Sequence, residues 1–169
     1  MPPAANPNLY TLDSPLTSTQ VLDELAATPK SLRSLLVGVP PGALSASPDP
    51  DGWSAFQALC HFRDAALVYA LRFRFIVFDQ DPLLPNYDEN NWVAAAHDRP
   101  EELPAILDEI AASRSDLVRV LRNMHDDAWQ RTGRHEVIGP VVLEDYVRHQ
   151  LAHERAHLAQ IREAIPAAT

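Results

Sequence analysis

Residues 146–161 read Y-V-R-H-Q-L-A-H-E-R-A-H-L-A-Q-I, and no proline or glycine interrupts this stretch. It favours a helix in which His149, His153 and His157 follow one another at intervals of four residues. Residues four apart lie one turn apart on the same face of a helix, so the three imidazoles form a row. Aromatic and apolar residues near the two ends of the row indicate that this face points into the interior of a helical domain.

The histidine row has the spacing of a metal site. Two neutral imidazoles one turn apart, about 6 Å along the helix axis, can bind the same metal ion. Exposed or hydrogen-bonded histidines are the ordinary alternative. An inward face would bury several polar rings, at a cost of about 1–3 kcal/mol for each ring without a partner. A shared metal ion removes this cost, so we interpret the row as metal-binding.

Three further segments share the helical periodicity of this one. Apolar residues recur at three- and four-residue spacing in four segments, 18–37, 54–78, 101–122 and 143–165. The second segment is apolar nearly all round, which is typical of a buried helix. The only β-like run, 137–143, is divided by Gly139-Pro140. The predicted fold class is all-α, a four-helix bundle with a long crossover connection between helices 2 and 3.

Prolines predict where these helices are interrupted. Residues 1–16 are proline-rich and are expected to form an N-terminal extended arm, followed by a single bundle domain over residues 17–169. Pro29 should bend or break the first helix. Residues 39–52 are rich in proline and glycine and are expected to be a loop. A short helical turn is expected at 92–97, within the long connection.

Composition restricts the class of protein. With 14 Lys+Arg against 23 Asp+Glu the net charge is −9, and the lack of a basic run argues against nucleic acid and anionic membranes as partners. No apolar run is long enough to span a bilayer, and the N-terminus lacks the features of a secretory signal. The single cysteine, Cys60, is expected to be a small buried residue in a reducing compartment. These features favour a cytoplasmic location.

A further histidine lies in the most apolar segment. His61 is a polar ring in a helix expected to be buried, so it needs a partner. Helical bundles build metal sites from side chains on facing helices. His61 opposite His153 and His157 would make a three-histidine site with open positions, which is the arrangement of catalytic zinc. Imidazole also suits nickel, copper and iron, so the ligands leave the metal open.

Other polar residues have two interpretations each. Asp64 either orients a metal ligand or is an exposed helix carboxylate. Glu154 completes the metalloprotease motif H-E-x-x-H, but the extended motif and a substrate-binding strand are absent from the sequence. It either polarises a metal-bound water or faces solvent, and we favour the solvent-facing position. His97, His125 and His135 lie in connections and are expected to be surface groups rather than ligands.

These residues together resemble the DinB/YfiT-like superfamily, whose members are regarded as metalloenzymes, over about residues 21–165. The resemblance rests on five groups in order: Leu25-Ala26-Ala27-Thr28-Pro29 with Leu35-Leu36; Trp53-Ser54 with His61 and Asp64; Pro85-Asn86-Tyr87-Asp88 with Trp92-Val93; Trp129-Gln130-Arg131 with residues 135–139; and His153-x-x-x-His157-x-x-Gln160-Ile161. Their order and spacing carry the resemblance, because no single group is specific.

The resemblance implies a four-helix bundle, often a homodimer, and a divalent metal, zinc or nickel, held by His61, His153 and His157. His149 lies outside this set as a neighbour. It implies a metal-dependent enzyme acting on a small molecule, either an S-transferase that uses a low-molecular-weight thiol such as bacillithiol or mycothiol, or a metal-dependent hydrolase. The alternative is a non-catalytic, stress-related metal-binding protein. The resemblance identifies no catalytic residue beyond the metal ligands.

Overall fold

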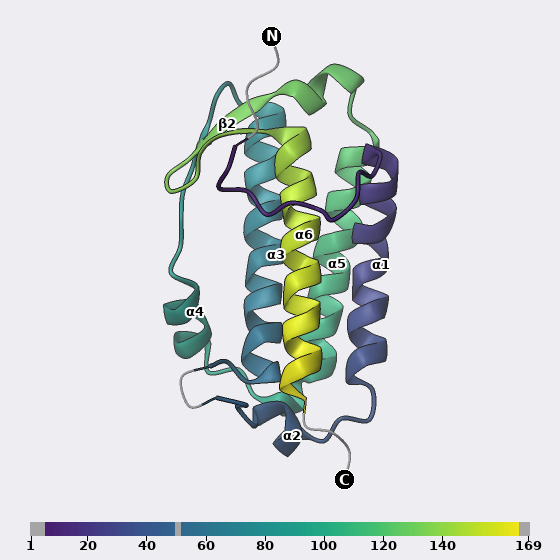
Figure 1. Cartoon of the computed structure of the whole chain (residues 1–169), viewed down its shortest axis with the longest axis vertical. Helices are drawn as coiled ribbons and strands as arrows, with labels where there is room; N and C mark the ends of the chain where they lie inside the picture. The colour runs from purple at the N-terminus through teal and green to yellow at the C-terminus, as the bar shows by residue number, and fades with distance from the viewer. Residues whose placement is uncertain (1–5, 50–51, 166–169) are drawn as a thin grey trace.

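A computed structural model of the chain describes residues 6–49 and 52–165. The predicted arm begins in residues 1–5 and the predicted domain ends in residues 166–169, and both of these segments lie outside the described residues. Four long helices lie side by side as predicted: α1 (Ser18–Leu36), α3 (Ala55–Phe78), α5 (Leu103–Arg122) and α6 (Leu143–Ala164) (Figure 1). The chain is therefore mostly helical.

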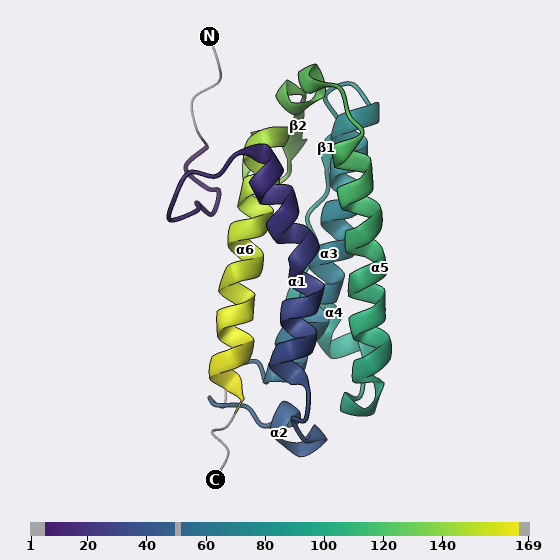
Figure 2. The ribbon, with the colours of Figure 1, turned by 90° about the vertical axis from the view of Figure 1, so that its right-hand side faces the viewer.

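The helices are not arranged in chain order around the bundle. Both α1 and α3 pack against α5 and α6, so α1 and α3 lie diagonally opposite each other (Figure 2). Helices α3 and α5 run in the same direction, opposite to that of α1 and α6 (Figure 1). The chain between α3 and α5 returns along the outside of the bundle, through β1 (Leu83–Leu84) and α4 (Glu89–Ala96), and α4 packs against α3.

Local capping explains where the first two long helices begin. The Thr17 side chain accepts from the backbone N–H of Gln20, whose side chain returns a bond to the backbone of Thr17. Ser54 and Gln57 make the same reciprocal pair at the start of α3. Such capping boxes satisfy backbone donors that a helix start would otherwise leave free. Both predicted starts are confirmed.

Two expectations based on proline need correction. Of the bend or break expected at Pro29, the break does not occur, because helix α1 continues through Pro29 to Leu36. Its buried face, with Leu25 and Leu32 fully enclosed, offsets the hydrogen bond and fit that proline removes. The expected loop 39–52 contains the short helix α2 (Pro41–Ser45), in which Pro41 occupies the first turn, where a missing N–H costs nothing.

The expectation that no strand forms is also wrong. Strands β1, β2 (Thr132–His135) and β3 (Gly139–Val142) form a small sheet in the order β1-β2-β3. β3 pairs antiparallel to β2 and lies at the edge, where Pro140 can be accommodated. Gly139 has a φ of 81°, which a glycine adopts without strain at the turn between the two strands. Gly139-Pro140 therefore forms the start of an edge strand instead of interrupting one.

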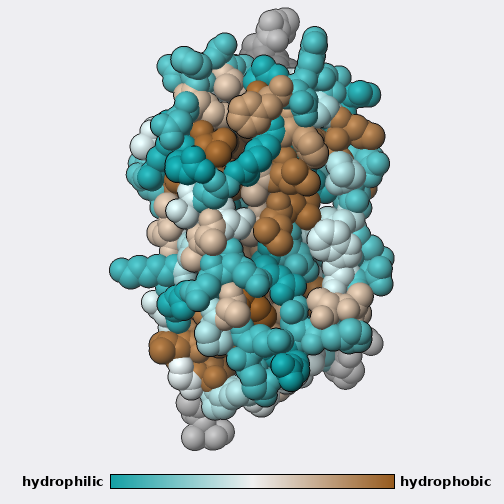
Figure 3. Space-filling view, turned by 180° about the vertical axis from the view of Figure 1, so that it is seen from behind, coloured by the Kyte–Doolittle hydropathy of each residue, from teal (hydrophilic) through white to brown (hydrophobic). Residues whose placement is uncertain are grey.

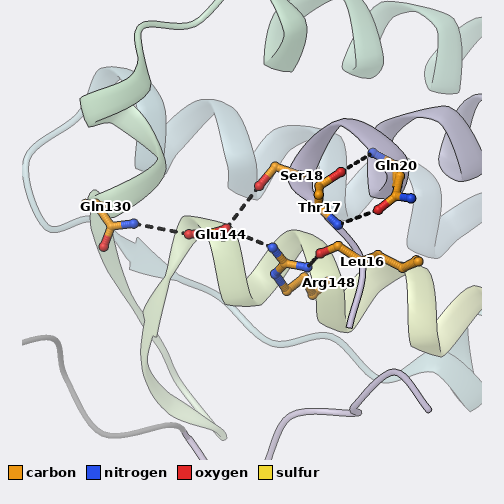
Figure 4. A network of polar contacts seen from close by, with 7 residues as sticks. All are labelled: Leu16, Thr17, Ser18, Gln20, Gln130, Glu144 and Arg148. Atoms are coloured by element: carbon orange, nitrogen blue, oxygen red, sulfur yellow. Dashed lines mark hydrogen bonds and ion pairs between the residues drawn. The ribbon is translucent and has the colours of Figure 1, made fainter. Parts of the chain in front are cut away.

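The chain before α1 is held against α6 by a polar network (Figure 4). The Glu144 carboxylate accepts from Ser18 Oγ at 3.0 Å, from Gln130 Nε2 at 3.2 Å and from Arg148 Nη2 at 2.8 Å. Arg148 also donates to the carbonyl of Leu16. Residues 6–16 have no regular helix or strand, and this network fixes the point at which they enter the bundle.

The core consists of two apolar clusters separated by polar residues. In α6 the first cluster ends at Leu151 and the second begins at Ile161. In α3 the second cluster ends at Phe62 and the first begins at Ala65. His153 and His157 therefore lie between the two apolar clusters, and His61 lies at the end of the second one.

The surface of the bundle exposes hydrophobic as well as hydrophilic residues. On the face opposite to that of Figure 1, hydrophobic residues form separate patches among hydrophilic ones (Figure 3). The exposed large hydrophobic residues include Leu67, Leu71 and Phe78 of α3. None of the described helices combines the length and the hydropathy needed to cross a membrane.

Candidate metal centre

The structure brings together the three histidines that the sequence singles out. His61 comes from α3, and His153 and His157 lie one turn apart on α6. One ligand atom from each lies within 4.8 Å of the others, and this is the one such group of three in the described part of the chain. The Nε2 atoms of His153 and His157 are 3.1 Å apart. Two nitrogens bound to one ion at about 2.0–2.1 Å would lie about 3.0–3.4 Å apart, so the rings fit a shared ion.

Hydrogen bonding prepares one of these rings for a metal. The Nδ1–H of His157 donates to Gln160 Oε1 at 2.7 Å, which leaves the lone pair on Nε2, the atom that faces His153. Fixing the tautomer through the other ring nitrogen is the usual support for a metal-binding histidine. Nδ1 of His61 is buried and has no hydrogen-bond partner. His61 therefore has a buried polar atom that no protein group satisfies.

Burial keeps the three rings in their neutral form. It lowers the pKa of His61 to about 4 and that of His153 to about 2, with nearby histidines adding to both shifts. Burial also lowers the pKa of His157. Because imidazole binds metals only when it is deprotonated, the site is ready to bind a cation at neutral pH.

The triad opens into a cavity of about 400 Å³ with aromatic walls. The ring of Trp53 lies 4.9 Å from that of His61, and the ring of Tyr87 lies 6.4 Å from it. Tyr69 contributes from α3, 5.8 Å from the His153 ring. A volume of this size suits a small molecule.

His149 lies next to the triad but has a protein partner. Its Nδ1 accepts a 2.7 Å hydrogen bond from the backbone N–H of Tyr10, and its ring stacks on Tyr146 at 5.6 Å. Burial lowers its pKa to about 4, so it is a neutral ring that anchors residues of the N-terminal segment. The Tyr10 ring lies 5.7 Å from His153 and completes the cavity wall. Sequence reasoning had no signal for Tyr10, because the contact spans 139 residues.

His135 was expected at the surface and is instead buried. It is 6 % exposed because β2 alternates exposed and buried residues and turns His135 inward. Its Nδ1 accepts from the backbone N–H groups of Val137 and Ile138, at 3.1 and 3.3 Å. The ring lines the same cavity as the triad. His97 and His125 are exposed, as predicted.

The expectation that Glu154 faces solvent is also wrong. Glu154 is 3 % exposed, and its carboxylate accepts from Arg114 of α5 and from Gln150 Nε2 at 2.9 Å. Burial raises the pKa of Glu154, and Arg114 opposes that shift. Adjacent helix residues point in different directions, so Glu154 turns away from the cavity that His153 faces. H-E-x-x-H therefore lacks the geometry of a protease, in which the glutamate is the base at the metal.

Asp64 and Cys60 take structural places near His61. Asp64 is buried, and its carboxylate accepts from Arg63 Nε at 3.0 Å instead of contacting a histidine ring. The expected exposure of Asp64 is therefore wrong, and no hydrogen bond supports the orienting role. Cys60 is buried as predicted, and burial raises the pKa of its thiol to about 12. It is a thiol, not a thiolate, at neutral pH.

Helix α3 carries two cavity residues that sequence reasoning passed over. Arg72 lies eleven residues after His61, which is about three turns and therefore the same face. Tyr69, one turn before Arg72, lines the same cavity. The helical spacing could have identified both positions, but their apolar neighbours conceal them.

Comparison with known proteins identifies the family of the chain. The sequence matches the DinB superfamily over residues 24–161. A protein of Oceanobacillus iheyensis, named provisionally as a metal-dependent hydrolase, is 23 % identical over 140 residues, 83 % of this chain and 81 % of that protein. A protein of Halalkalibacterium halodurans with the same name is 22 % identical over 144 residues, 85 % of this chain and 84 % of its own length.

A solved structure has the same fold. YfiT from Bacillus subtilis, described as having an unusual four-helix bundle topology, superimposes with a TM-score of 0.82 at 19 % identity, covering 92 % of this chain and 91 % of YfiT. The fold and the family match extend over the helices that carry His61, His153 and His157. The chain belongs to the DinB superfamily.

Proposed function

We propose that this protein is a metal-dependent enzyme that acts on a small molecule, with His61, His153 and His157 as the metal ligands. The observation that carries the proposal is the meeting of three neutral imidazoles, with ligand atoms within 4.8 Å of one another, on the wall of a cavity. Three histidines suit zinc or nickel, and a three-ligand site leaves positions open for a reacting group.

A divalent ion held by three imidazoles acts as a Lewis acid and lowers the pKa of a bound water or thiol. The protein's own residues supply the rest. Gln160 holds His157 in one tautomer, and His149 ties the segment around Tyr10 to the cavity wall. Tyr69 and Tyr87 provide flat apolar faces that exclude water from the space beside the triad.

Hydrolysis of a small molecule is the first candidate reaction. Two relatives similar in sequence over more than four fifths of the chain are named as metal-dependent hydrolases. In this chain Glu154 is paired with Arg114 and does not reach the cavity. The carboxylate on the described cavity wall is Glu89, which is exposed at the start of α4 and is the candidate general base.

A thiol S-transferase is the second candidate, and the placement of Glu154 favours it. A transferase that uses a low-molecular-weight thiol of the bacillithiol or mycothiol type ionises the thiol directly and needs no carboxylate base beside the ion. Apart from the exposed Glu89, no carboxylate of the described residues lines this cavity, and the thiol reaction needs none. Conjugation of an electrophile that requires both metal and thiol would support the transferase. Turnover of esters or amides without thiol would support the hydrolase.

Metal analysis tests the site itself. Wild-type protein purified without chelator is expected to hold about one zinc or nickel ion per chain by mass spectrometry. His61→Ala, His153→Ala and His157→Ala should each lose most of it while keeping the helical circular dichroism of the wild type. His125→Ala, at an exposed position outside the cavity, is the matched control. Wild-type metal content in all three ligand variants would contradict the proposal.

Two further predictions concern the setting of the enzyme. A homodimer stays a prediction, and exposed hydrophobic residues of α3, Leu67 and Leu71, are compatible with a contact between copies. Light scattering at several protein concentrations measures the mass.

A non-catalytic, stress-related metal protein is the alternative function, and it predicts bound metal with no turnover of any thiol, ester or amide substrate tested.

A further inference from the structure

The cavity wall includes a buried cation that is bonded to neutral groups. Arg72 is 5 % exposed and lines the cavity together with the triad. Its Nη1 donates to the Tyr146 hydroxyl at 3.0 Å, and its Nη2 donates to the carbonyl of Pro85. Neither acceptor carries a charge. Buried charges in proteins are normally paired with an opposite charge, so this arrangement needs an explanation.

The rest of the described chain pairs its enclosed arginines. Arg114, the other buried arginine of the described chain, forms an ion pair with Glu154. Arg63, with a side chain 13 % exposed, pairs with Asp64 and Asp98. Arg72 differs from both in having no carboxylate partner among the described residues, and it lines the cavity of the histidine triad. The position of its missing counter-charge is therefore accessible to a ligand.

The guanidinium has donors to spare. It carries five N–H groups, and the bonds to Tyr146 and Pro85 use two of them. Nε is buried and has no hydrogen-bond partner. The planar fork of a guanidinium matches the paired oxygens of a carboxylate or a phosphate.

Two tyrosines connect this cation to the triad. The Tyr87 ring lies 6.4 Å from the His61 ring, nearly parallel to it, and 5.9 Å from the guanidinium carbon of Arg72. The Tyr69 ring lies 5.8 Å from the His153 ring and 5.9 Å from the same carbon. A small molecule lying against these two rings can reach the triad with one end and Arg72 with the other.

We infer that Arg72 binds a carboxylate or phosphate group of the substrate and selects for anionic small molecules whose reactive group lies at the histidine triad. The assignment of the anion to a substrate rests on the proposed function. Arg72 acts as a specificity-determining residue, and the neutral bonds to Tyr146 and Pro85 hold its guanidinium in place. A purely structural Arg72 would fasten the segment around Pro85 to α3 and would show no preference for anions.

Binding to the metal-free, full-length protein tests this separately from the metal chemistry. The probes are benzoate, phenyl phosphate and the uncharged benzamide, which share one ring and differ in the charged group. Chemical-shift titration measures their affinities for wild type, Arg72→Met and Arg131→Met. Arg131 is the matched control, because it also donates to backbone carbonyls, those of Ile76 and Asp79, but lies outside this cavity.

Wild type is expected to bind benzoate or phenyl phosphate at least tenfold more tightly than benzamide, and the tighter anion identifies the preferred head group. Arg72→Met should lose this preference, and Arg131→Met should keep it. Equal binding of all three probes by wild type, or binding of neither anion, overturns the inference without any variant. An anion preference that survives in folded Arg72→Met also overturns it. Because no metal is present, these outcomes are independent of whether the triad holds an ion.

Discussion

The two sides of α6 show two ways of burying polar groups. On one side Glu154 is enclosed by Arg114 and Gln150, so that its charge meets an opposite charge within the protein. On the other side His153 faces a cavity and has another imidazole as its nearest polar neighbour. The first network is closed by the protein, and the second is left open to a ligand. Burial of a polar group therefore does not identify a site, whereas a missing partner does.

The comparison separates stability from binding. A closed ion pair contributes nothing to ligand binding, but removal of one partner leaves a buried charge alone. Replacing one neutral histidine of the open side should lower the free energy of unfolding less, because no buried charge is left behind. Substitutions on the two sides of α6 should therefore affect different measurements.

The largest expected effect is on the closed side. Arg114→Met leaves Glu154 buried without its counter-charge and should lower the free energy of unfolding by about 3–5 kcal/mol. Urea denaturation of the metal-free protein at pH 7 measures it. Arg33→Met, which removes an exposed pair with Asp108, is the control and should change stability by no more than about 1 kcal/mol. Equal, small losses in the two variants would mean that the closed network is not what stabilises this side.

The open side should respond through metal affinity. Gln160→Leu removes the acceptor for His157 Nδ1–H and frees the ring to adopt the other tautomer. We expect zinc affinity to fall about 10–100-fold, the usual effect of removing a group that orients a metal-binding histidine. Competition with a chromophoric chelator measures this. Gln130→Leu, which loses a bond to Glu144 far from the triad, should bind zinc like the wild type. Unchanged affinity in Gln160→Leu would remove Gln160 from the site.

Features that depend on local helical periodicity could be predicted from the sequence. Four-residue spacing placed His153 and His157 on one face of α6, and Ser54 marked the start of the helix that carries His61. Both depend on neighbours within one or two turns, which a sequence displays directly. The three-histidine cluster was predictable because both helices had to turn their polar rings inward.

Features that depend on distant partners were not predictable. Glu154 carried no sign that Arg114, 40 residues earlier, would enclose it, so a solvent-facing position was the reasonable expectation. His135 was predicted to be exposed because the sequence gives no sign of strand β2, which turns its side chain inward. That strand forms only by pairing with β1 and β3. Arg72 was overlooked because its significance lies in the lack of a counter-charge, which only the folded chain reveals.

The smallest expected effect concerns His135, an imidazole whose hydrogen-bond partners are backbone N–H groups rather than a charged group or a metal ion. Its pKa is lowered to about 4 from an ordinary 6.5, chiefly by burial, with Arg72 adding to the shift. Protonation of Nδ1 would also break its bonds with the N–H groups of Val137 and Ile138. Between these two pKa values the imidazole of His135 is protonated in the unfolded chain and neutral in the folded chain. His135 therefore does not lower the free energy of unfolding above pH 6.5, and it lowers that free energy increasingly as the pH drops toward 4.

The test compares unfolding free energies of metal-free proteins at pH 7 and pH 5. In His135→Gln, whose amide oxygen can still accept a backbone N–H, the loss of stability on acidification should be smaller than in wild type by about 1–2 kcal/mol. His125→Gln, at an exposed position, should lose as much as the wild type. If His135→Gln also follows the wild type, neither burial nor the bonds to the backbone keep His135 neutral in the folded chain. The contrast between the two sides of α6 would then have to rest on the charge pair of Glu154 with Arg114 alone.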